Sequence, residues 1–206
     1  MRLPVVLTLL MLCLAVPAQA FERGHVYRLQ ETGDCPGCNL REASLPGADL
    51  DHARLRGAIL EGADLSGARL AGADLVGAGL AGSTLSDATI SGANLYRADL
   101  RGAELGYADL SAADISRADL GHATLIAADL RQARISVSRL EGVDLTSADL
   151  TGADLTGSDL TNAALNDTIL AGADLSRVRG LSQRQLDRAC GDAASILPPG
   201  LTLPPC

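Results

Sequence analysis

Leucine, or isoleucine in its place, occupies every fifth position from Leu40 to Leu175 without a break in register. The run contains 28 such positions, and all are leucine except Ile90, Ile115 and Ile135. Alanine stands two residues earlier in 22 of the 28 units. A period of five fits neither an α-helix, with about 3.6 residues per turn, nor a flat strand, with a period of about two. The pattern therefore indicates a repeat architecture in which one small unit recurs.

The polar positions of each unit have the residue types that turns require. Aspartate stands just before the leucine in 13 units, and asparagine, serine or threonine does so in 6 more. Such side chains accept hydrogen bonds from nearby backbone N–H groups at turns. Glycine stands two residues after the leucine in 13 units, where it suits the positive φ of a type II turn. Each unit is therefore predicted to be a short bridge and a corner, with alanine and leucine pointing inward.

The unit reads Ala-Asp-Leu-x-Gly, as in Ala63–Gly67 and Ala153–Gly157. Over residues 38–177 the chain resembles the pentapeptide-repeat family, whose consensus is Ala-(Asp/Asn)-Leu-x-x. The resemblance implies an all-β fold: a right-handed quadrilateral β-helix with four units per coil. The 28 units then give about seven coils. Coils about 4.8 Å apart make a shaft on the order of 34 Å long.

A few units depart from the repeat. The alanine is replaced at five positions between the ends: Ser83, Ser138, Val143, Ser158 and Thr168. Residues 135–143 form the least regular stretch, where we expect one wall to bulge while the register survives.

Residues 1–20 have the pattern of a cleavable signal peptide. Arg2 gives a positive start, Leu3–Val16 is largely apolar, and Ala18-Gln19-Ala20 fits a cleavage site. The apolar run is too short to span a membrane. Cleavage after Ala20 gives a periplasmic or secreted protein that begins at Phe21. Its net charge is the −8 of the whole chain minus the one arginine lost, or −9.

The segments that flank the repeat are predicted to cap the shaft, because open solenoid ends need covering. Residues 21–37 form the N-terminal cap. Val26 and Leu29 fit one helical face that Gly33 would end, so a short helix is favoured, whereas alternation of Tyr27 and Leu29 fits a strand.

Residues 178–206 form the C-terminal cap and a Pro-rich tail. Ser182 and Gln185 predict a capping box, with Leu181 and Leu186 as its hydrophobic staple. We expect a helix over about 183–190 that ends at Gly191 and packs on the last coil. The tail over 196–206 contains too many prolines for a helix or a central strand and is expected to be extended.

The predicted mature chain keeps four cysteines: Cys35, Cys38, Cys190 and Cys206. An even number in an exported protein suggests two disulfides. In the β-helix that the resemblance implies, Cys35 and Cys38 lie at the front of the shaft and Cys190 at the back. Cα atoms must approach within about 7 Å to be bridged. We therefore expect the pairs Cys35–Cys38 and Cys190–Cys206.

Carboxylates 20 residues apart are expected to stack on one face of the shaft. Asp109, Asp129 and Asp149 would form one column, and Asp99 and Asp119 a second. Neighbouring charges about 4.8 Å apart repel by about 1 kcal/mol in a high dielectric, a cost that turn hydrogen bonds offset. The columns are the candidate acidic interaction surface, either a weak cation site or a surface for a basic partner.

Composition narrows the function further. Aromatic residues make up 2% of the chain, there is no lysine, and the sequence pI is about 4.8. The acidic balance disfavours nucleic acid as a partner. His25, His52 and His122 are not expected to converge with a nucleophile, so we predict no enzyme activity, no metal and no cofactor.

Three functions are weighed. The favoured one is an exported, non-enzymatic structural or protein-interaction module with an unknown protein partner. Some pentapeptide-repeat proteins resemble duplex DNA and bind a topoisomerase, and the acidic rod fits that alternative, although export opposes it. A third hypothesis is a thiol–disulfide protein that uses the C-x-x-C of Cys35 and Cys38, although a structural staple is favoured there.

Overall fold

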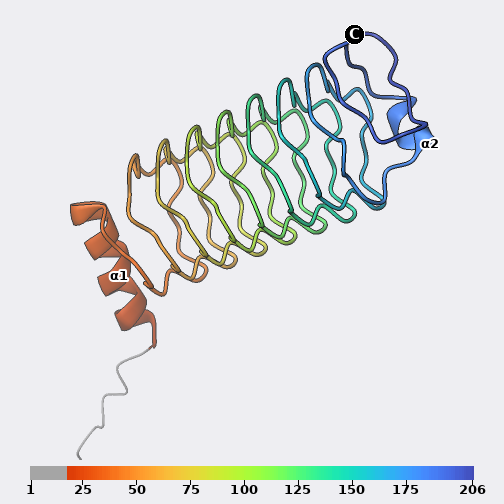
Figure 1. Cartoon of the computed structure of the whole chain (residues 1–206). Helices are drawn as coiled ribbons and strands as arrows, with labels where there is room; N and C mark the ends of the chain where they lie inside the picture. The colour runs from red at the N-terminus through yellow and green to blue at the C-terminus, as the bar shows by residue number, and fades with distance from the viewer. Residues whose placement is uncertain (1–17) are drawn as a thin grey trace, which may run out of the picture.

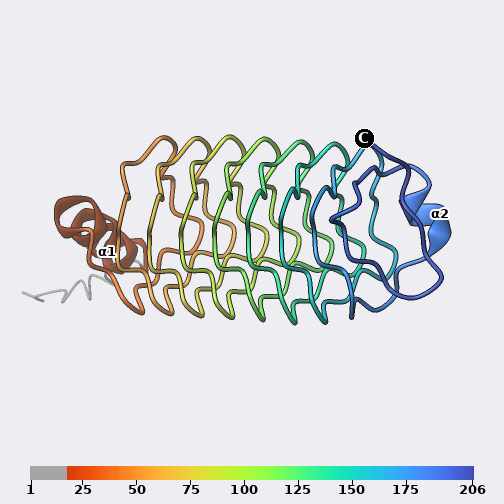
Figure 2. The ribbon, with the colours of Figure 1, turned by 45° about the horizontal axis from the view of Figure 1, so that its top comes forward.

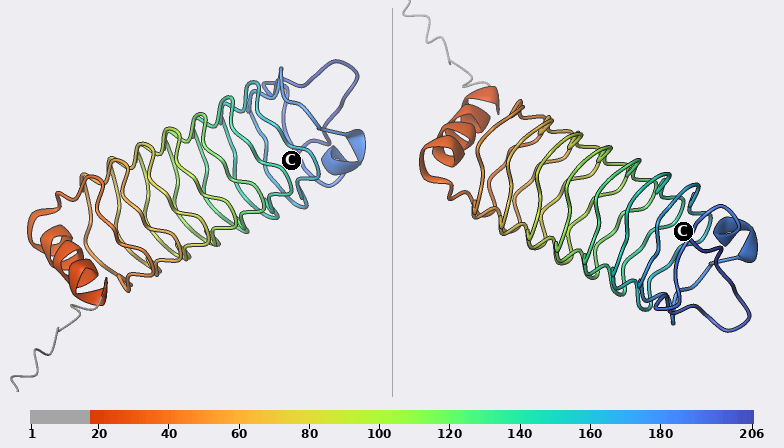
Figure 3. Two further views of the ribbon diagram at one scale, coloured as in Figure 1. Left: turned by 90° about the horizontal axis from the view of Figure 1, so that it is seen from below. Right: turned by 90° about the horizontal axis from the view of Figure 1, so that it is seen from above.

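The computed structural model describes residues 18–206, so most of the predicted signal peptide lies outside the described part. The described chain is an elongated stack of coils, with helix α1 (Ala18–Thr32) at one end and helix α2 (Gln183–Leu186) at the other (Figure 1). The coils follow one another regularly along the rod in every view (Figures 2 and 3). Within residues 18–206, neither helix is long and apolar enough to cross a membrane.

Isolated parallel β-bridges join each coil to the next. From the pair Asp34 and Arg54 to the pair Asp159 and Arg179, the partners lie 20 residues apart, which is four five-residue units. In the middle of the shaft, the Leu100 amide donates to the Asp119 carbonyl at 2.7 Å, and the Asp119 amide donates back to the Ala98 carbonyl at 3.0 Å. The backbone groups of one coil are therefore satisfied by its neighbours.

The interior consists of the leucines and alanines of the repeat. All 28 leucine or isoleucine positions are buried, as are nearly all of the alanines two residues before them. The small alanine beside each leucine keeps the coil narrow enough for the side chains to fill it. The predicted inward orientation of these two positions is confirmed.

The four hydroxyl residues that replace interior alanines are buried, and each donates its hydroxyl to a backbone carbonyl. The pairs are Ser83 with Leu80, Ser138 with Ile115, Ser158 with Ile135 and Thr168 with Leu145, at 2.5 to 2.8 Å. These bonds offset the cost of burying a polar group.

The bulge that we expected over residues 135–143 is absent. Arg139 pairs with both Asp119 and Asp159, so the 20-residue register passes through this stretch unchanged. The Ser158 hydroxyl oxygen accepts the Ser138 amide at 3.1 Å, and Val143 is fully buried. The prediction was wrong because a serine or a valine fits the interior position when its polar groups find partners within the wall.

The corners all use the same backbone conformation. From Glu42 to Gly172, every residue two positions after the leucine has a φ between 55° and 75°. Thirteen of these residues are glycine, as the turn prediction requires, and fourteen are not. A non-glycine residue is strained in this region, most of all when it is β-branched, as Val137 is at φ 60°. The contacts between coils therefore impose the turn even where the local sequence disfavours it.

The aspartates before the leucines tie down the same corners. In all 13 such units the aspartate Oδ1 accepts the amide N–H two residues later, at 2.9 to 3.4 Å. Serine or threonine two residues later adds a hydroxyl donor in several units, as Thr161 does to Asp159 at 2.6 Å. Side-chain hydrogen bonds from Ser66, Thr161 and Ser176 lower the pKa of Asp64, Asp159 and Asp174 respectively.

The N-terminal segment is helical, as favoured, and the strand alternative is wrong. Helix α1 ends at Gly33, whose φ is 63° and whose amide donates to the Leu29 carbonyl at 2.8 Å. Leu29 is buried against the interior of the first coil, and Val26 is half-buried there. The helix therefore covers the front end of the shaft.

At the other end, helix α2 is shorter than the predicted helix over 183–190. The capping box forms, since Gln185 Oε1 accepts the Ser182 amide at 2.9 Å and the Ser182 hydroxyl at 2.7 Å. The chain then rejoins the ladder: the Arg188 carbonyl accepts the Asp167 amide at 2.7 Å, and Cys190 pairs with Ile169. Pairing with the last coil competes with further helical turns and ends the helix at Leu186.

Gly191 does not end a helix, so that prediction was also wrong. Its amide donates to the Pro204 carbonyl at 2.9 Å, and its carbonyl accepts the Cys206 amide at 3.0 Å. The tail is extended, as predicted, and its last residues pair in parallel with Gly191. The cysteines form the two expected pairs, Cys35–Cys38 and Cys190–Cys206.

Gln185 also connects α2 to the exposed end of the shaft. Its Nε2 donates to the Leu160 carbonyl at 2.9 Å and to the Ala163 carbonyl at 3.0 Å. One side chain thus caps the helix and satisfies two carbonyls of the last coil.

Replacing Val137 by glycine is expected to raise the free energy of unfolding by about 1 kcal/mol, because it removes the strain of a β-branched residue at positive φ. Val137 is 54% exposed, so little burial is lost. Urea denaturation measures the change. As a matched control, Gly142→Ala should destabilise, since its Cβ would lie 2.6 Å from His122 Nδ1. A destabilised Val137→Gly protein would show that the corner is not strained.

The corner aspartates should make the rod acid-sensitive. Their lowered pKa values mean that the folded state binds fewer protons than the unfolded state, so the stabilisation is full above about pH 4 and disappears as the pH falls through the folded values. The melting temperature, followed from neutral pH to about pH 2.5, should therefore fall. Asp159→Asn, which keeps an acceptor oxygen but does not titrate, should flatten the slope. A melting temperature independent of pH would contradict this account.

Gln185→Glu keeps the acceptor for Ser182 but removes the two donors to the last coil. We expect a loss of about 1 to 3 kcal/mol, because the Leu160 and Ala163 carbonyls lose the donors from Gln185 and face a carboxylate. Amide exchange at Leu186 and Asp187 should accelerate, which measures loosening confined to the cap. Arg184→Gln, a change at an exposed residue of the same helix, is the control and should stay within about 0.5 kcal/mol. Equal effects of the two variants would remove Gln185 from this role.

Candidate functional site

The acidic columns stack as the sequence predicts. Asp129 forms bridges with both Asp109 and Asp149, and Asp99 forms one with Asp119. The carboxylates of each column therefore lie on successive coils of one wall. Each of the five also accepts the amide N–H two residues later, so its first role is structural.

The columns are less acidic than expected, because arginines lie on them. Arg131 binds Asp129 through two nitrogens, with Nε 2.8 Å from Oδ1 and Nη2 2.5 Å from Oδ2. Asp129, Asp149 and Asp109 together raise the pKa of Arg131. The guanidinium thus lies within the field of all three carboxylates, and the middle of this column is neutralised.

The second column is compensated in the same way. Arg101 Nε donates to Asp99 Oδ1 at 2.7 Å, and Arg139 Nε lies 3.6 Å from Asp119 Oδ2. The side-chain hydrogen bonds from Arg101 and Arg131 lower the pKa of Asp99 and Asp129 respectively. The sequence contains a signal for this pairing. Arg101 and Arg131 each follow an aspartate by two residues, in the triplet Asp-Leu-Arg. The carboxylates of Asp99 and Asp129 are therefore paired with cations, and the use of the columns as an interaction surface stays a prediction.

Other ion pairs connect one coil to the next elsewhere on the rod. Arg134 Nη2 lies 2.6 Å from Asp114 Oδ2, and Arg69 pairs with Asp51 of the preceding coil. The two arginine side chains are largely exposed, so each pair contributes little stability. The walls thus carry arginines among the carboxylates rather than carboxylates alone.

The histidines do not converge. His52 and His122 are exposed corner residues, and their rings lie over Gly72 and Gly142 of the next coil. His25, in α1, is tied to the first coil, where the Asn39 amide donates to its Nδ1 at 3.1 Å. Across residues 18–206, no three His, Cys, Asp or Glu side chains come together as metal ligands could.

The C-x-x-C pair is closed off from solvent. Cys35 is 0% exposed and Cys38 is 2% exposed. Helix α1 covers the bond, with Cys35 Sγ 3.4 Å from the His25 carbonyl oxygen. A redox-active disulfide has to be reached by a thiol, so this geometry favours the structural staple.

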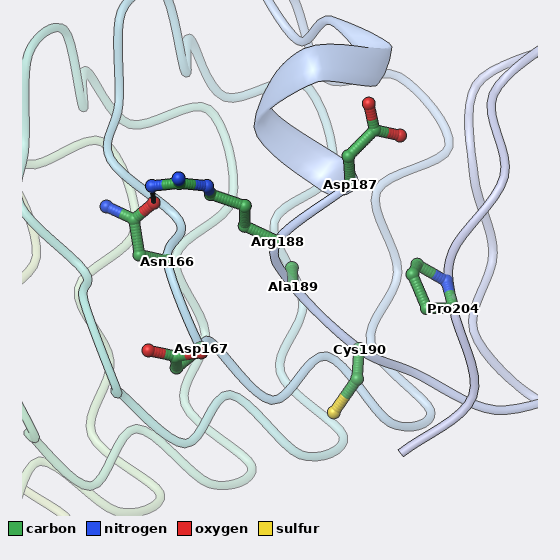
Figure 4. A pocket seen from close by; sticks show the side chains of 7 residues that line it. All are labelled: Asn166, Asp167, Asp187, Arg188, Ala189, Cys190 and Pro204. Atoms are coloured by element: carbon green, nitrogen blue, oxygen red, sulfur yellow. Dashed lines mark hydrogen bonds between the residues drawn. The ribbon is translucent and has the colours of Figure 1, made fainter.

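Several hollows mark the surface of the described rod, and two of them bear on function. The larger, about 520 Å³, lies where the C-terminal cap meets the last coil, between Asn166, Arg188, Cys190 and Pro204 (Figure 4). In it the Arg188 side chain reaches back to Asn166, with Nη1 3.1 Å from Oδ1. This hollow exists only because the chain turns back at α2, and no local pattern predicted it.

The second hollow, about 470 Å³, surrounds Tyr107, which is 68% exposed. Ile126 of the following coil lines it together with Asp87 and Glu104. Tyr107 occupies a corner position at φ 60°, where glycine would be relaxed. The sequence signal was an aromatic residue at the glycine position of a unit, and we had not singled it out.

The comparison with protein-family models agrees with this architecture. A family model described as pentapeptide repeats matches eight copies over residues 34–62, 63–102, 93–132 and 138–177. A search of the curated proteins finds no match.

Similar solved structures are also pentapeptide-repeat proteins or resistance proteins. HetL, involved in heterocyst differentiation regulation in the cyanobacterium Nostoc, is 29% identical, and the match covers 84% of this chain and 98% of HetL with a TM-score of 0.34. A protein of the Arabidopsis thaliana thylakoid lumen is 27% identical over 67% of this chain and 74% of its own, with a TM-score of 0.29. Full-length QnrB1, a plasmid-mediated fluoroquinolone resistance protein, is 18% identical, and the match covers 73% of this chain and 92% of QnrB1 with a TM-score of 0.34.

The family assignment rests on the repeats themselves. The matched units are the ones whose leucines fill the interior and whose corners turn the chain. Because the family model covers more than half of the chain, this protein belongs to the pentapeptide-repeat family, whose fold is a right-handed β-helix.

Proposed function

We propose that this protein is an exported, non-enzymatic structural or protein-interaction module, built on a four-sided shaft of about seven coils. The observation that carries the proposal is the use of its polar side chains. The 13 unit aspartates each bind a corner amide, and the buried hydroxyls bind backbone carbonyls. These carboxylates and hydroxyls are therefore engaged in holding the coil.

The proposed location is the periplasm or the exterior of the cell. The signal-like pattern of residues 1–20 supports it, as do two disulfides, which persist in oxidising compartments. The expected mature N-terminus is Phe21. Because α1 continues to Thr32, twelve of its residues would remain to cover the front coil.

The hollow around Tyr107 is the proposed contact surface for a protein partner. A large exposed aromatic residue held at positive φ lowers the stability of the rod, and such strain is retained at sites with a function. Ile126 extends the apolar area, and Asp87 and Glu104 flank it with negative charge. A partner segment with apolar and basic side chains is complementary to this surface.

Tyr107→Gly tests this surface. The substitution should relieve the corner and leave the melting temperature equal or higher, but it should reduce capture of the partner about tenfold or more in a pull-down from the exported fraction. Val137→Gly is the matched control, since it removes another exposed apolar residue from a strained corner of a different column. Capture of the same partner by both variants at wild-type levels would reject the Tyr107 surface.

DNA mimicry is the second candidate. Stacked carboxylates on a rod of net charge −8 support it, and QnrB1 is a fluoroquinolone resistance protein. The arginines on the columns oppose it, because a row of phosphates carries no such cations. Protection of gyrase from a fluoroquinolone by the purified rod would favour mimicry over the module. The burial of Cys35 and Cys38 likewise opposes a thiol–disulfide enzyme.

A further inference from the structure

The two disulfides differ in their access to solvent. The front pair, Cys35 and Cys38, is buried beneath α1. In the back pair, Cys190 is half-buried and Cys206 is exposed. Thiol–disulfide exchange requires a thiolate to reach one of the two sulfurs, so access alone separates the two bonds.

A hollow in the C-terminal cap lies next to the back disulfide. The 520 Å³ hollow between the last coil and the tail is lined by Cys190, with Arg188 and Pro204 beside it (Figure 4). In Figure 4 the Arg188 side chain is directed toward Asn166, away from Cys190. The back bond therefore lies between this hollow, on the Cys190 side, and the exposed residue Cys206.

The back bond also holds a segment that has few other attachments. The tail begins with a pairing to the last coil, where the Ile196 amide donates to the Ala173 carbonyl at 2.9 Å and the Ile196 carbonyl accepts the Leu175 amide at 2.7 Å. Beyond Ile196, two backbone hydrogen bonds hold the tail to the cap, from the Gly191 amide to the Pro204 carbonyl and from the Cys206 amide to the Gly191 carbonyl. Gln183 adds two more, since its Oε1 accepts the Thr202 amide and its Nε2 donates to the Thr202 carbonyl, both at 3.0 Å. Leu201 and Leu203 are only partly buried against the core. The front bond, in contrast, joins residues three apart and holds no comparable segment.

We propose that Cys190–Cys206 is a thiol-exchange site, and that its reduction by a dithiol releases the end of the tail, beyond Ile196, from the C-terminal edge of the shaft. A thiolate of the dithiol attacks the exposed Cys206 Sγ, forms a mixed disulfide and expels the Cys190 thiolate. The second thiol of the reagent then displaces Cys206. The reagent leaves as a disulfide, two electrons pass to the cysteines, and its two protons end on the Cys190 and Cys206 thiols.

Release of the tail changes the end of the rod without disturbing its shaft. The bonds that Gly191 makes to Pro204 and Cys206 open, and a backbone edge of the cap becomes free. The ladder of bridges between residues 34 and 179 contains only the front disulfide, Cys35–Cys38, which lies in its first unit. Reduction of the back disulfide therefore leaves this ladder in place. Reduction and oxidation of this disulfide therefore change the C-terminal end of the rod alone.

The test uses the full chain, native buffer and increasing dithiothreitol, with iodoacetamide trapping and mass spectrometry to follow each cysteine. We expect Cys190 and Cys206 to be alkylated about tenfold or more faster than Cys35 and Cys38. Hydrogen exchange at the Gly191 and Cys206 amides should accelerate about tenfold or more in the same samples, while exchange at Leu100 stays unchanged. Equal reactivity of the two pairs, or faster reaction at the front, would overturn the assignment.

Two variants separate release from general unfolding. Cys206→Ser should show the fast exchange at the Gly191 amide without any reductant. Cys35→Ser combined with Cys38→Ser should leave the response of the back pair intact. A reduced protein whose Gly191 and Cys206 amides stay protected would show that the tail is held without the bond, and would also overturn the proposal.

Discussion

The hydrogen-bonded register of 20 residues between coils is the interaction on which the rest of this structure depends. Each unit donates amides to both neighbouring coils: the Leu100 amide donates to the Asp119 carbonyl of the next coil, and the Asp99 amide donates to the Ala78 carbonyl of the preceding one. A coil alone could not satisfy these groups, and stacked coils satisfy them all along the walls. The register also fixes which side chains share a column, and it leaves unsatisfied edges only at the two ends.

The same register explains why the corners tolerate so many residue types. Fourteen non-glycine residues adopt positive φ, including Val137 and Tyr107. Each of them is held by the bridges before and after its corner, so the local strain is shared with a long ladder. Corner positions are therefore available for binding other molecules, whereas the inward positions are filled by core packing and accept only small or apolar residues.

The ends and the charges follow from this constraint in different ways. Because every coil presents an edge, each end needs a cover, which α1 provides at the front and α2 with the tail at the back. The columns place like charges on successive coils, and arginines such as Arg131 offset them. Each cap contains one disulfide, and the two bonds differ in exposure. Helix α1 covers the front bond, whereas the back bond attaches the extended tail.

The sequence by itself determined the features that repeat. The period of five, the inward alanine and leucine, the corner glycines and the turn-binding aspartates are local patterns, and each is confirmed. The capping box at Ser182 and the helix near Leu29 were likewise readable from short spacings. The pairing of the four cysteines followed from which end of the rod each one occupies.

Only the tertiary structure decided what depends on contacts between coils. Helix α2 ends at Leu186 because Arg188 and Cys190 pair with a coil some 20 residues earlier, and Gly191 pairs with the tail instead of ending the helix. The absence of a bulge at Ser138, the arginines on the acidic columns and the unequal burial of the disulfides are of the same kind. A local pattern records the preferences of a few neighbouring residues, whereas these features are set by partners that only the folded coil brings together.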